Sequence, residues 1–430
     1  MKFIKNNIVV RMILVVLVMI CLGYILRTAT YIIPVGPMKT NMQKCKELFD
    51  KEGKYQVLNY DYLSTRLDNY TDAIMLMTAM YDDDEKSILE KSAGNYRFLY
   101  DGKNPMESVS AYLNDVANDS ETDYARYWHG YLVLLKPILL FFDYTDVRVL
   151  NMIVQSLLTL YLLSLLYKDS LLKKYTLPLI ASLLAVNPFT ISYSMQYSWV
   201  YYILLISSIL LISKRDYFIQ SPDKLLLFFT IIGAMTSYFD LLTWPLATCA
   251  FPLVFVLITN ADNWLKKLIC VIKCGVSWGV GYLGMWCGCW AISSISLRKN
   301  IFKDAIDQVA FRVSNNISTS DVHIVTVKEV FRNQFFPLMK WPYAIMLFIV
   351  LIISLIELAK HIRKEGFQPK TLLLDTIPFI LLCILPFIWF AATRNHSFLH
   401  YTFTWRTLIV TIFSGLSMIV KLAEDREDVR

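Results

Sequence analysis

The chain has 430 residues, of which 56% are hydrophobic and 14% aromatic, with a mean hydropathy of +0.45 and a formal net charge of +7. This composition excludes an ordinary soluble globular protein, because the chain repeats apolar runs of about 20 residues, the length of a bilayer-spanning helix. The net positive charge does not indicate nucleic-acid binding, since Lys and Arg cluster in short loops between the apolar runs and so carry a topology signal.

The first apolar run, residues 8–27, follows Lys2 and Lys5 and contains Arg11. It has no small-residue cleavage site and is long for a signal peptide, so we interpret it as a retained signal anchor. The basic start predicts a cytoplasmic N-terminus.

A long first loop, residues 28–146, comes next and contains two apolar stretches that are predicted helices, 72–81 and 127–142. The second stretch is short for a span, and Lys136–Pro137 lies at its centre. Counting it as a span would also move the later basic loops to the wrong face of the membrane. We expect both helices to lie along the membrane surface, with Lys136 snorkelling and Pro137 ending or kinking the second helix.

The rest of the chain is predicted to be mostly membrane-spanning, with a second extracytoplasmic loop at 295–341. The sequence therefore predicts an all-α integral membrane protein of about ten transmembrane helices, with residues 1–430 forming a single polytopic membrane domain. The predicted spans after the first are 147–167, 176–191, 197–213, 225–241, 245–260, 268–293, 342–359, 371–393 and 403–421.

The distribution of basic residues between alternate loops predicts the orientation. "KDSLLKKY", "SKRDYFIQSPDK", "NADNWLKK" and "AKHIRKEGFQPK" lie on one side, together with the C-terminal "KLAEDREDVR". The short turns on the other side, such as "YFDLLTWP", have almost no Lys or Arg. We therefore expect both termini to be cytoplasmic.

Two carboxylates, Asp68 and Asp72, lie in "RLDNYTDAIML" at the start of the first predicted loop helix. Thr71 is a good N-cap for a helix over 72–81, and Asp72 in its first turn would complement the helix dipole. Asp68 precedes that cap and has no such structural explanation. A carboxylate at the outer membrane face can act as a general base or hold a divalent cation such as Mg²⁺ or Mn²⁺. We predict Asp68 as catalytic, with Asp72 as the second candidate.

Three further residues on the outer side are candidate substrate ligands. Arg126 and His129, in "DYARYWHGY", are three residues apart and could share a helix face that binds a phosphate or relays a proton. Asp240 is the only charged residue in "TSYFDLLTWP" and is a candidate contact for a sugar hydroxyl. The alternatives are an interfacial aromatic belt for the first pair and solvation of a helix end for Asp240.

The last outer turn, "RNHSFLHYTFTWR", contains Arg394, His396, His400 and Arg406. The two histidines, four residues apart, could share a helix face as metal ligands, although two ligands are a weak signal. Arg406 lies in an apolar helix and needs either snorkelling or an anionic partner, for which a lipid phosphate is well suited because guanidinium binds phosphate in a bidentate manner. These clusters predict an outer cavity with acids on one side and Arg and His on the other.

The pattern resembles the GT-C superfamily of polytopic membrane glycosyltransferases. The pieces that carry the resemblance are "RLDNYTDAIML" in the long first loop, "YWHGYLVLLKPILLFF" and the late "NHSFLHYTFTWR". The resemblance implies transfer of a sugar from a polyprenyl-phosphate-linked donor to a cell-envelope glycan or lipid-linked acceptor on the extracytoplasmic face. It implies Asp68 as the acceptor-activating base and Arg406 or Arg394 as a ligand of the donor phosphate. The chain departs from the family in lacking an adjacent pair of acids.

Two other function classes remain open from the sequence. A transporter or flippase of a lipid-linked glycan would have polar residues at mid-membrane depth and inverted repeats, and few such charges and no repeat are found. A non-catalytic envelope-assembly protein is the third possibility. We expect a multi-pass protein of a bacterial plasma membrane with membrane lipids as partners.

Overall fold

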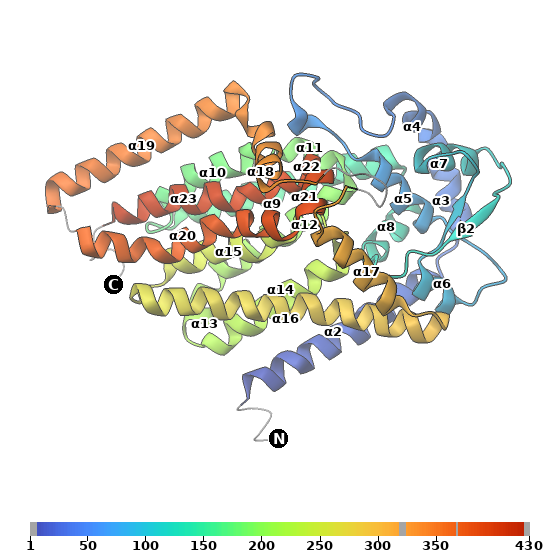
Figure 1. The fold of residues 1–430 in the computed structure, drawn as a ribbon, viewed down its shortest axis with the longest axis horizontal. Helices are drawn as coiled ribbons and strands as arrows, with labels where there is room; N and C mark the ends of the chain where they lie inside the picture. The colour runs from blue at the N-terminus through green and yellow to red at the C-terminus, as the bar shows by residue number, and fades with distance from the viewer. Residues whose placement is uncertain (1–6, 318–323, 367–368, 425–430) are drawn as a thin grey trace.

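The computed structural model describes residues 7–317, 324–366 and 369–424. Long helices lie side by side in one bundle, and residues 31–143 form a region of short helices and loops at one end of it (Figure 1). Within the described residues the strands β1 (Arg97–Leu99) and β2 (Ser120–Thr122) form one antiparallel pair in that region. The predicted all-α class is confirmed, with the small sheet as a local addition, and the long apolar helices are consistent with a membrane protein.

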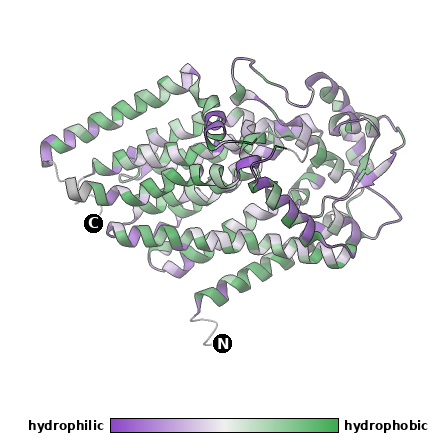
Figure 2. Cartoon of the chain, viewed as in Figure 1, coloured by the Kyte–Doolittle hydropathy of each residue, from purple (hydrophilic) through white to green (hydrophobic). Residues whose placement is uncertain are grey.

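Seven helical segments of the described chain are long and apolar enough to cross a membrane. Figure 2 shows that these long helices are dominated by hydrophobic residues. They comprise α2 (Ile8–Thr30), α9 (Tyr144–Lys168), α12 (Met195–Ser213), α16 (Trp264–Leu297), α19 (Trp341–Glu365), α20 (Pro369–Ala392) and the composite segment Tyr401–Leu422, which contains α22 (Tyr401–Thr404), η5 (Trp405–Leu408) and α23 (Ile409–Leu422).

The other three predicted spans are helical but shorter. The segment 176–191 is divided into α10 (Thr176–Ala185) and α11 (Pro188–Tyr193), because Asn187 has a left-handed φ of 55° and a proline follows it. The second is α14 (Pro222–Phe239) and the third α15 (Leu246–Thr259), whose 14 residues are about 21 Å long and fall short of a bilayer core. The structure thus supports a multi-pass protein.

The helices α14 and α16 pack closely because Gly233 of α14 faces the backbone of α16 and Gly281 of α16 faces the backbone of α14. A Cβ on Gly233 would lie 2.0 Å from the carbonyl oxygen of Trp278, and one on Gly281 would lie 1.9 Å from that of Thr230. Small residues allow this approach, which increases van der Waals contact between membrane helices.

The 31–143 region has its own hydrophobic core, to which Met38, Phe49, Leu76 and Tyr131 belong. Its helices are α3 (Val35–Met42), η1 (Gln43–Cys45), α4 (Lys46–Glu52), η2 (Leu63–Thr65), α5 (Asn69–Ala79), α6 (Ile88–Gly94), α7 (Pro105–Leu113) and α8 (Leu132–Leu139). The expectation that the first apolar stretch lies on the membrane surface is wrong. Nine of the eleven residues of α5 are buried inside the protein, so core packing explains their apolar character.

The second apolar stretch of this region forms only the short helix α8, so the prediction that it does not span is consistent with the structure. The predicted snorkelling of Lys136 is wrong, because its side chain is only 1% exposed and its Nζ lies 4.5 Å from the centre of the Tyr31 ring. Burial lowers the pKa of Lys136 to about 8. Pro137 lies inside the helix, which ends two residues later.

The remaining short elements connect the long helices. The predicted second loop contains α17 (Ile301–Val313), α18 (Val327–Phe335) and η4 (Phe336–Met339), and the connection after α20 contains α21 (Arg394–Leu399). At the opposite end of the bundle lie η3 (Lys173–Tyr175) and α13 (Arg215–Ile219). The end of α23 lies at that end too, because Lys421 Nζ donates a hydrogen bond to the carbonyl of Ile258 near the end of α15.

Candidate functional site

Asp68 lies where the 31–143 region meets the bundle. Its Oδ1 accepts a hydrogen bond from the Thr71 N–H at 3.0 Å, and its Oδ2 accepts one from the Thr71 hydroxyl at 3.1 Å. Its own N–H donates to Ser194 Oγ at the start of α12, 3.0 Å away. The side chain is 4% exposed, and burial raises the pKa of the carboxyl to about 7. A carboxyl with this pKa can exchange a proton near neutral pH.

Asp72 also bonds to the start of α12 and is fully buried. Its Oδ2 accepts hydrogen bonds from the Tyr144 hydroxyl at 2.5 Å and the Met195 N–H at 2.9 Å, and its Oδ1 accepts one from the Gln196 N–H at 3.0 Å. Burial raises the pKa of this carboxyl to about 6. Asp72 therefore satisfies backbone donors of the first turn of α12, which have no partner within that helix.

This geometry corrects the structural roles that were predicted for Asp68 and Asp72. The N-cap of α5 is Asp68 and not Thr71, and the helix begins at Asn69 and not at residue 72. Asp68 thus has a structural function that the sequence reading denied it. The carboxylate of Asp72 bonds to another helix and not to the N–H groups of its own helix.

A buried polar network that the sequence reading missed extends from Asp72. Arg148 in α9 forms a bidentate pair with Glu52, with both N–O distances 2.8 Å, and also donates to Asn69 and to the Tyr144 hydroxyl. The signal available in the sequence was an arginine one turn into an apolar helix, which needs a partner. The network fixes α4 and α5 to α9.

Arg406 connects the late segment to the 31–143 region. It is fully buried, and its guanidinium donates to the carbonyls of Val186, Thr402 and Ser64 at 3.1–3.3 Å. Its Cζ also lies 4.2 Å from the centre of the Tyr197 ring. The predicted snorkelling alternative is wrong for this residue. Its partners in the described chain are backbone carbonyls and aromatic rings, which is the arrangement of a cross-link between three segments.

The two histidines of the late segment are adjacent, with ring centres 4.9 Å apart. His400 Nε2 lies 2.5 Å from Arg312 Nη1, and because arginine only donates, this nitrogen is the acceptor. Burial and Arg312 lower the pKa of His400 to about 3. Burial also lowers the pKa of His396, whose ring nitrogens are both buried without a hydrogen-bond partner among the described residues. Both rings are neutral at pH 7.

Asp240 ends α14 and is 3% exposed. Its carboxylate accepts hydrogen bonds from the N–H and the hydroxyl of Thr243, in the same D-x-x-T arrangement that Asp68 makes with Thr71. Leu242 in this turn has a φ of 64°, a strained conformation for a bulky residue that is found most often near functional sites. The alternative that Asp240 is simply solvated at a helix end is wrong, because the residue is buried, and its predicted contact with a sugar hydroxyl stays a prediction.

Arg126 and His129 do not share a helix face, because the chain around them is irregular and His129 has a φ of 52°. Arg126 pairs with Asp304 of α17 at 3.0 Å. His129 Nε2 faces the Tyr124 carbonyl at 3.0 Å and must donate, so Nδ1 accepts from the Tyr131 hydroxyl. Burial lowers the pKa of His129 to about 3, which leaves it neutral.

Three arginines that the sequence did not single out as ligands, Arg66, Arg97 and Arg312, share one property with the predicted ligand Arg394. In the described chain, Arg66, Arg97, Arg312 and Arg394 have no carboxylate within 4 Å. Arg66 stacks on Tyr55 at 4.3 Å and Arg97 on Tyr124 at 5.5 Å. Arg66, Arg97 and Arg394 each have a buried nitrogen without a partner, so they have donors available for an anion.

Aromatic residues connect the candidate residues of the different segments. Burial raises the pKa of Tyr127, and the charges of Arg312, Arg126 and Asp240 all act on its phenol. Phe403 links the late segment to the Asp68 side, since its ring centre lies 5.2 Å from that of His400 and 6.0 Å from that of Tyr197. Tyr197 in turn donates a hydrogen bond to the carbonyl of Arg66.

No protein-family model, curated protein or solved structure matches the chain. The assignment of a function therefore depends on the residues themselves.

A divalent cation held by Asp68 and Asp72 does not fit the described residues. Both oxygens of Asp72 already accept hydrogen bonds, and those donors occupy the positions of metal ligands. Within the described chain, no three His, Cys, Asp or Glu side chains are grouped so that they could hold a metal ion. Among the described residues, His396 and His400 thus lack a third ligand of these types.

Proposed function

We propose that this protein is a GT-C-like glycosyltransferase that moves a sugar from a polyprenyl-phosphate-linked donor to a cell-envelope glycan or lipid-linked acceptor on the extracytoplasmic face of a bacterial plasma membrane. The observation that carries the proposal is Asp68. Its carboxyl is buried, its pKa is raised to about 7, and it lies at the junction between the membrane helices and the 31–143 region.

The proposed reaction uses Asp68 as the general base. The acceptor hydroxyl attacks the anomeric carbon of the donor sugar, and its proton passes to the Asp68 carboxylate. The bond between the anomeric carbon and the phosphate oxygen breaks, and its electron pair leaves with the polyprenyl phosphate. The pKa of about 7 suits this step, because a useful fraction of the carboxyl is ionised at neutral pH.

Arginines, and not histidines, supply the positive charge in this proposal. His129, His396 and His400 are neutral at pH 7, so they cannot hold the departing phosphate as cations. Arg66, Arg97 and Arg394 have unpaired guanidinium groups with a free buried nitrogen each. Such groups match phosphate oxygens in geometry and charge. Arg406 positions the segments that carry these groups, and Asp240 stays the candidate for a sugar hydroxyl.

The alternatives make different demands on the fold. A transporter places its charged binding residues near the middle of the membrane. Here the buried arginines of spanning helices are near one end of the bundle: Arg27 is in the last turn of α2, Arg148 in the second turn of α9, and Arg406 in the second turn of the segment Tyr401–Leu422. This one-sided arrangement favours a reaction at a membrane face over passage through it.

The Asp68→Asn variant tests the proposal because it separates the two functions of this residue. Asparagine caps a helix as well as aspartate does, so the fold of α5 is expected to survive. Asparagine cannot accept the proton, and loss of a general base lowers a rate by about 10²–10⁴-fold. In cells whose own gene is deleted, D68N is expected to abolish the envelope glycan at normal protein abundance.

The matched control is Asp61→Asn, an exposed carboxylate in the same loop, which is expected to leave the glycan unchanged. Full glycan production by D68N at normal abundance would refute the catalytic assignment. Loss of glycan in both variants would show an effect of the loop that is unrelated to proton transfer.

A further inference from the structure

A large cavity lies at the end of the bundle opposite to Asp68. Its volume is about 1780 Å³, well above the roughly 300–1,000 Å³ of a pocket for a drug-sized ligand. The first turns of α2, α14 and α16 and the last turns of α12 and α15 line it, whereas the other ends of α2, α12 and α16 are hydrogen-bonded to the 31–143 region. The cavity is therefore separate from the candidate site by the length of the bundle.

The walls of the cavity are apolar and partly open to the surroundings. Ile13 of α2 is 49% exposed, and Ile272 and Val276 of α16 are 50% and 60% exposed. These residues belong to helices long and apolar enough to span a membrane, and exposed apolar side chains on such helices are suited to contact with lipid. An apolar cavity of this size that opens towards lipid suits a lipid molecule.

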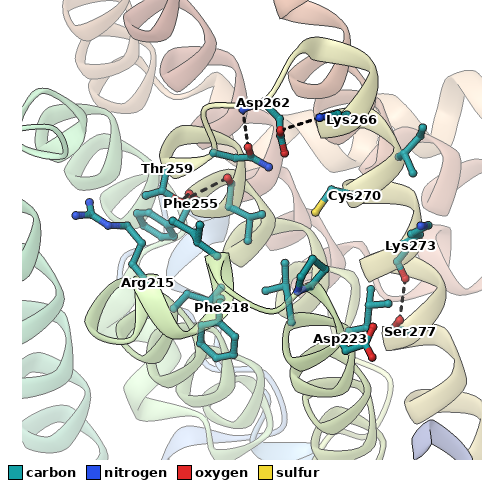
Figure 3. Close-up of a pocket in the computed structure, with 18 of the residues that line it drawn as sticks. Arg215, Phe218, Asp223, Phe255, Thr259, Asp262, Lys266, Cys270, Lys273 and Ser277 are labelled. Carbon is teal, nitrogen blue, oxygen red and sulfur yellow. Dashed lines mark hydrogen bonds and ion pairs between the residues drawn. The ribbon is translucent and has the colours of Figure 1, made fainter. Parts of the chain in front are cut away.

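Charged residues gather at the polar end of the cavity, and its acids are all paired. Figure 3 shows Arg215 and Phe218 on one side and Lys266, Cys270 and Lys273 on the α16 side. The ion pairs of the four lining acids are Arg215 with Asp169 and with Asp216, Arg11 with Asp223, and Lys266 with Asp262.

Two of the lining bases are not paired in this way. Lys168 and Lys273 have no carboxylate within 4 Å in the part of the chain that the structure describes. The four bases and four acids of the lining balance in number, but Arg215 pairs with two acids and Arg11, outside the lining, pairs with a third, so the positive charges of Lys168 and Lys273 are not neutralised by a direct ion pair.

Lys273 is the more informative of the two. It lies seven residues, or about 10 Å, beyond Lys266 on the same face of α16, between Ile269 and Val276. An unpaired charge beside the apolar wall of a membrane helix is costly unless it reaches water or an anionic partner, and it marks a functional site by default. A lipid whose tails occupy the apolar wall would bring its headgroup to this lysine.

We propose that this cavity is a binding site for one anionic phospholipid of the leaflet at which α16 begins. The acyl chains lie along Ile13, Ile272 and Val276, and the negatively charged headgroup lies between Lys273 and Lys168. The proposal does not depend on the proposed function, because it concerns other residues at the other end of the helices.

The experiment measures lipid retention by native mass spectrometry of the full chain, purified after incubation with vesicles of phosphatidylglycerol or phosphatidylcholine. Wild type is expected to retain phosphatidylglycerol preferentially. Lys273→Gln is expected to lower that retention about fivefold, the effect of one lysine on an anionic lipid, and to leave phosphatidylcholine unchanged. Lys360→Gln, an exposed lysine of α19 outside the cavity, is the control and is expected to behave as wild type.

A second variant tests the cavity by volume and not by charge. Val276→Trp places a large ring in the cavity and is expected to reduce retention of phosphatidylglycerol even if the lysine variant fails to fold. Equal retention of the two lipids by wild type, or wild-type retention in both K273Q and V276W, would overturn the proposal. Displacement of phosphatidylglycerol by about 10 mM inorganic phosphate, a concentration in the range of weak ionic sites, would show a phosphate site instead and would overturn the proposal.

Discussion

At the scale of residues, the notable feature is that the acids of the candidate site are buried without a directly paired cation. Asp68 and Asp240 accept hydrogen bonds from the threonine three residues later. These bonds favour the ionised form of a carboxyl, yet burial outweighs them at Asp68 and raises its pKa. Because α5 is packed inside the protein, its N-cap is desolvated with it, and a neutral cap such as Asn or Ser would avoid the cost of a buried carboxylate. The cost of burial is therefore the best argument that Asp68 is more than a cap.

The raised pKa of Asp68 predicts how stability depends on pH. The pKa of the Asp68 carboxyl is about 7 in the folded state against the ordinary aspartate value of 3.8, so the folded state binds more protons than the unfolded state between about pH 4 and 7. The contribution of Asp68 to stability is present below pH 4 and is lost as the pH rises through 7. The thermal midpoint of D68N in detergent is expected to fall less between pH 5 and pH 8 than that of wild type, whereas D61N keeps the wild-type slope.

At the scale of elements, the beginning of α12 is where the parts of the candidate site meet. The N–H of Asp68 and the carboxylate of Asp72 both bond to residues 194–196, and Tyr197 stacks under Arg406. Two helical segments from opposite ends of the sequence are thereby fixed on one helix terminus. Helix crossings deeper in the bundle keep that terminus in place.

The crossing of α14 and α16 gives a prediction with an internal control. Gly281→Ala would place its Cβ against the Thr230 carbonyl, so the helices must separate, and overpacking of this kind costs about 1–3 kcal/mol. Gly279→Ala lies on the same helix with no atom within 4 Å of its Cβ and is expected to be neutral or stabilising. Thermal unfolding of both variants in the same detergent checks this; equal midpoints would contradict the packing argument.

At the scale of the whole molecule, the two ends of the bundle differ in character. The 31–143 region and the late segment with Arg394 cover one end, and the cavity with Lys273 lies at the other. In the proposed orientation the first end is extracytoplasmic. This orientation follows from the distribution of Lys and Arg between the loops.

Cysteine labelling in intact cells tests the orientation. Asn118 and Glu365 are both exposed. Asn118 lies two residues before β2, and Glu365 is the last residue of α19, at the opposite end of the bundle (Figure 1). A membrane-impermeant thiol reagent is expected to modify the Asn118→Cys variant in intact cells and the Glu365→Cys variant only after permeabilisation. The parent chain measures the background from native cysteines, and the reverse pattern would invert the topology.

The sequence by itself determined the membrane class of the protein, because apolar runs such as 8–27 and 342–359 must be shielded from water whatever their neighbours are. It also predicted the long first loop and the short late turn as the places where polar residues gather. It could not show that α5 is buried in protein and not on lipid, since both environments select the same apolar residues.

Only the tertiary structure decided which partners each polar residue has. Asp72 and Met195 are hydrogen-bonded although they lie 123 positions apart, and Arg406 bonds to Ser64 across 342 positions. Local sequence patterns cannot predict pairs at such separations. The same contacts made the three histidines of the site neutral, because burial removes the water that would stabilise their charge. Sequence spacing carries no information on such long-range burial, so it could not show that, of the predicted Arg and His ligands of the donor phosphate, the histidines are uncharged at pH 7.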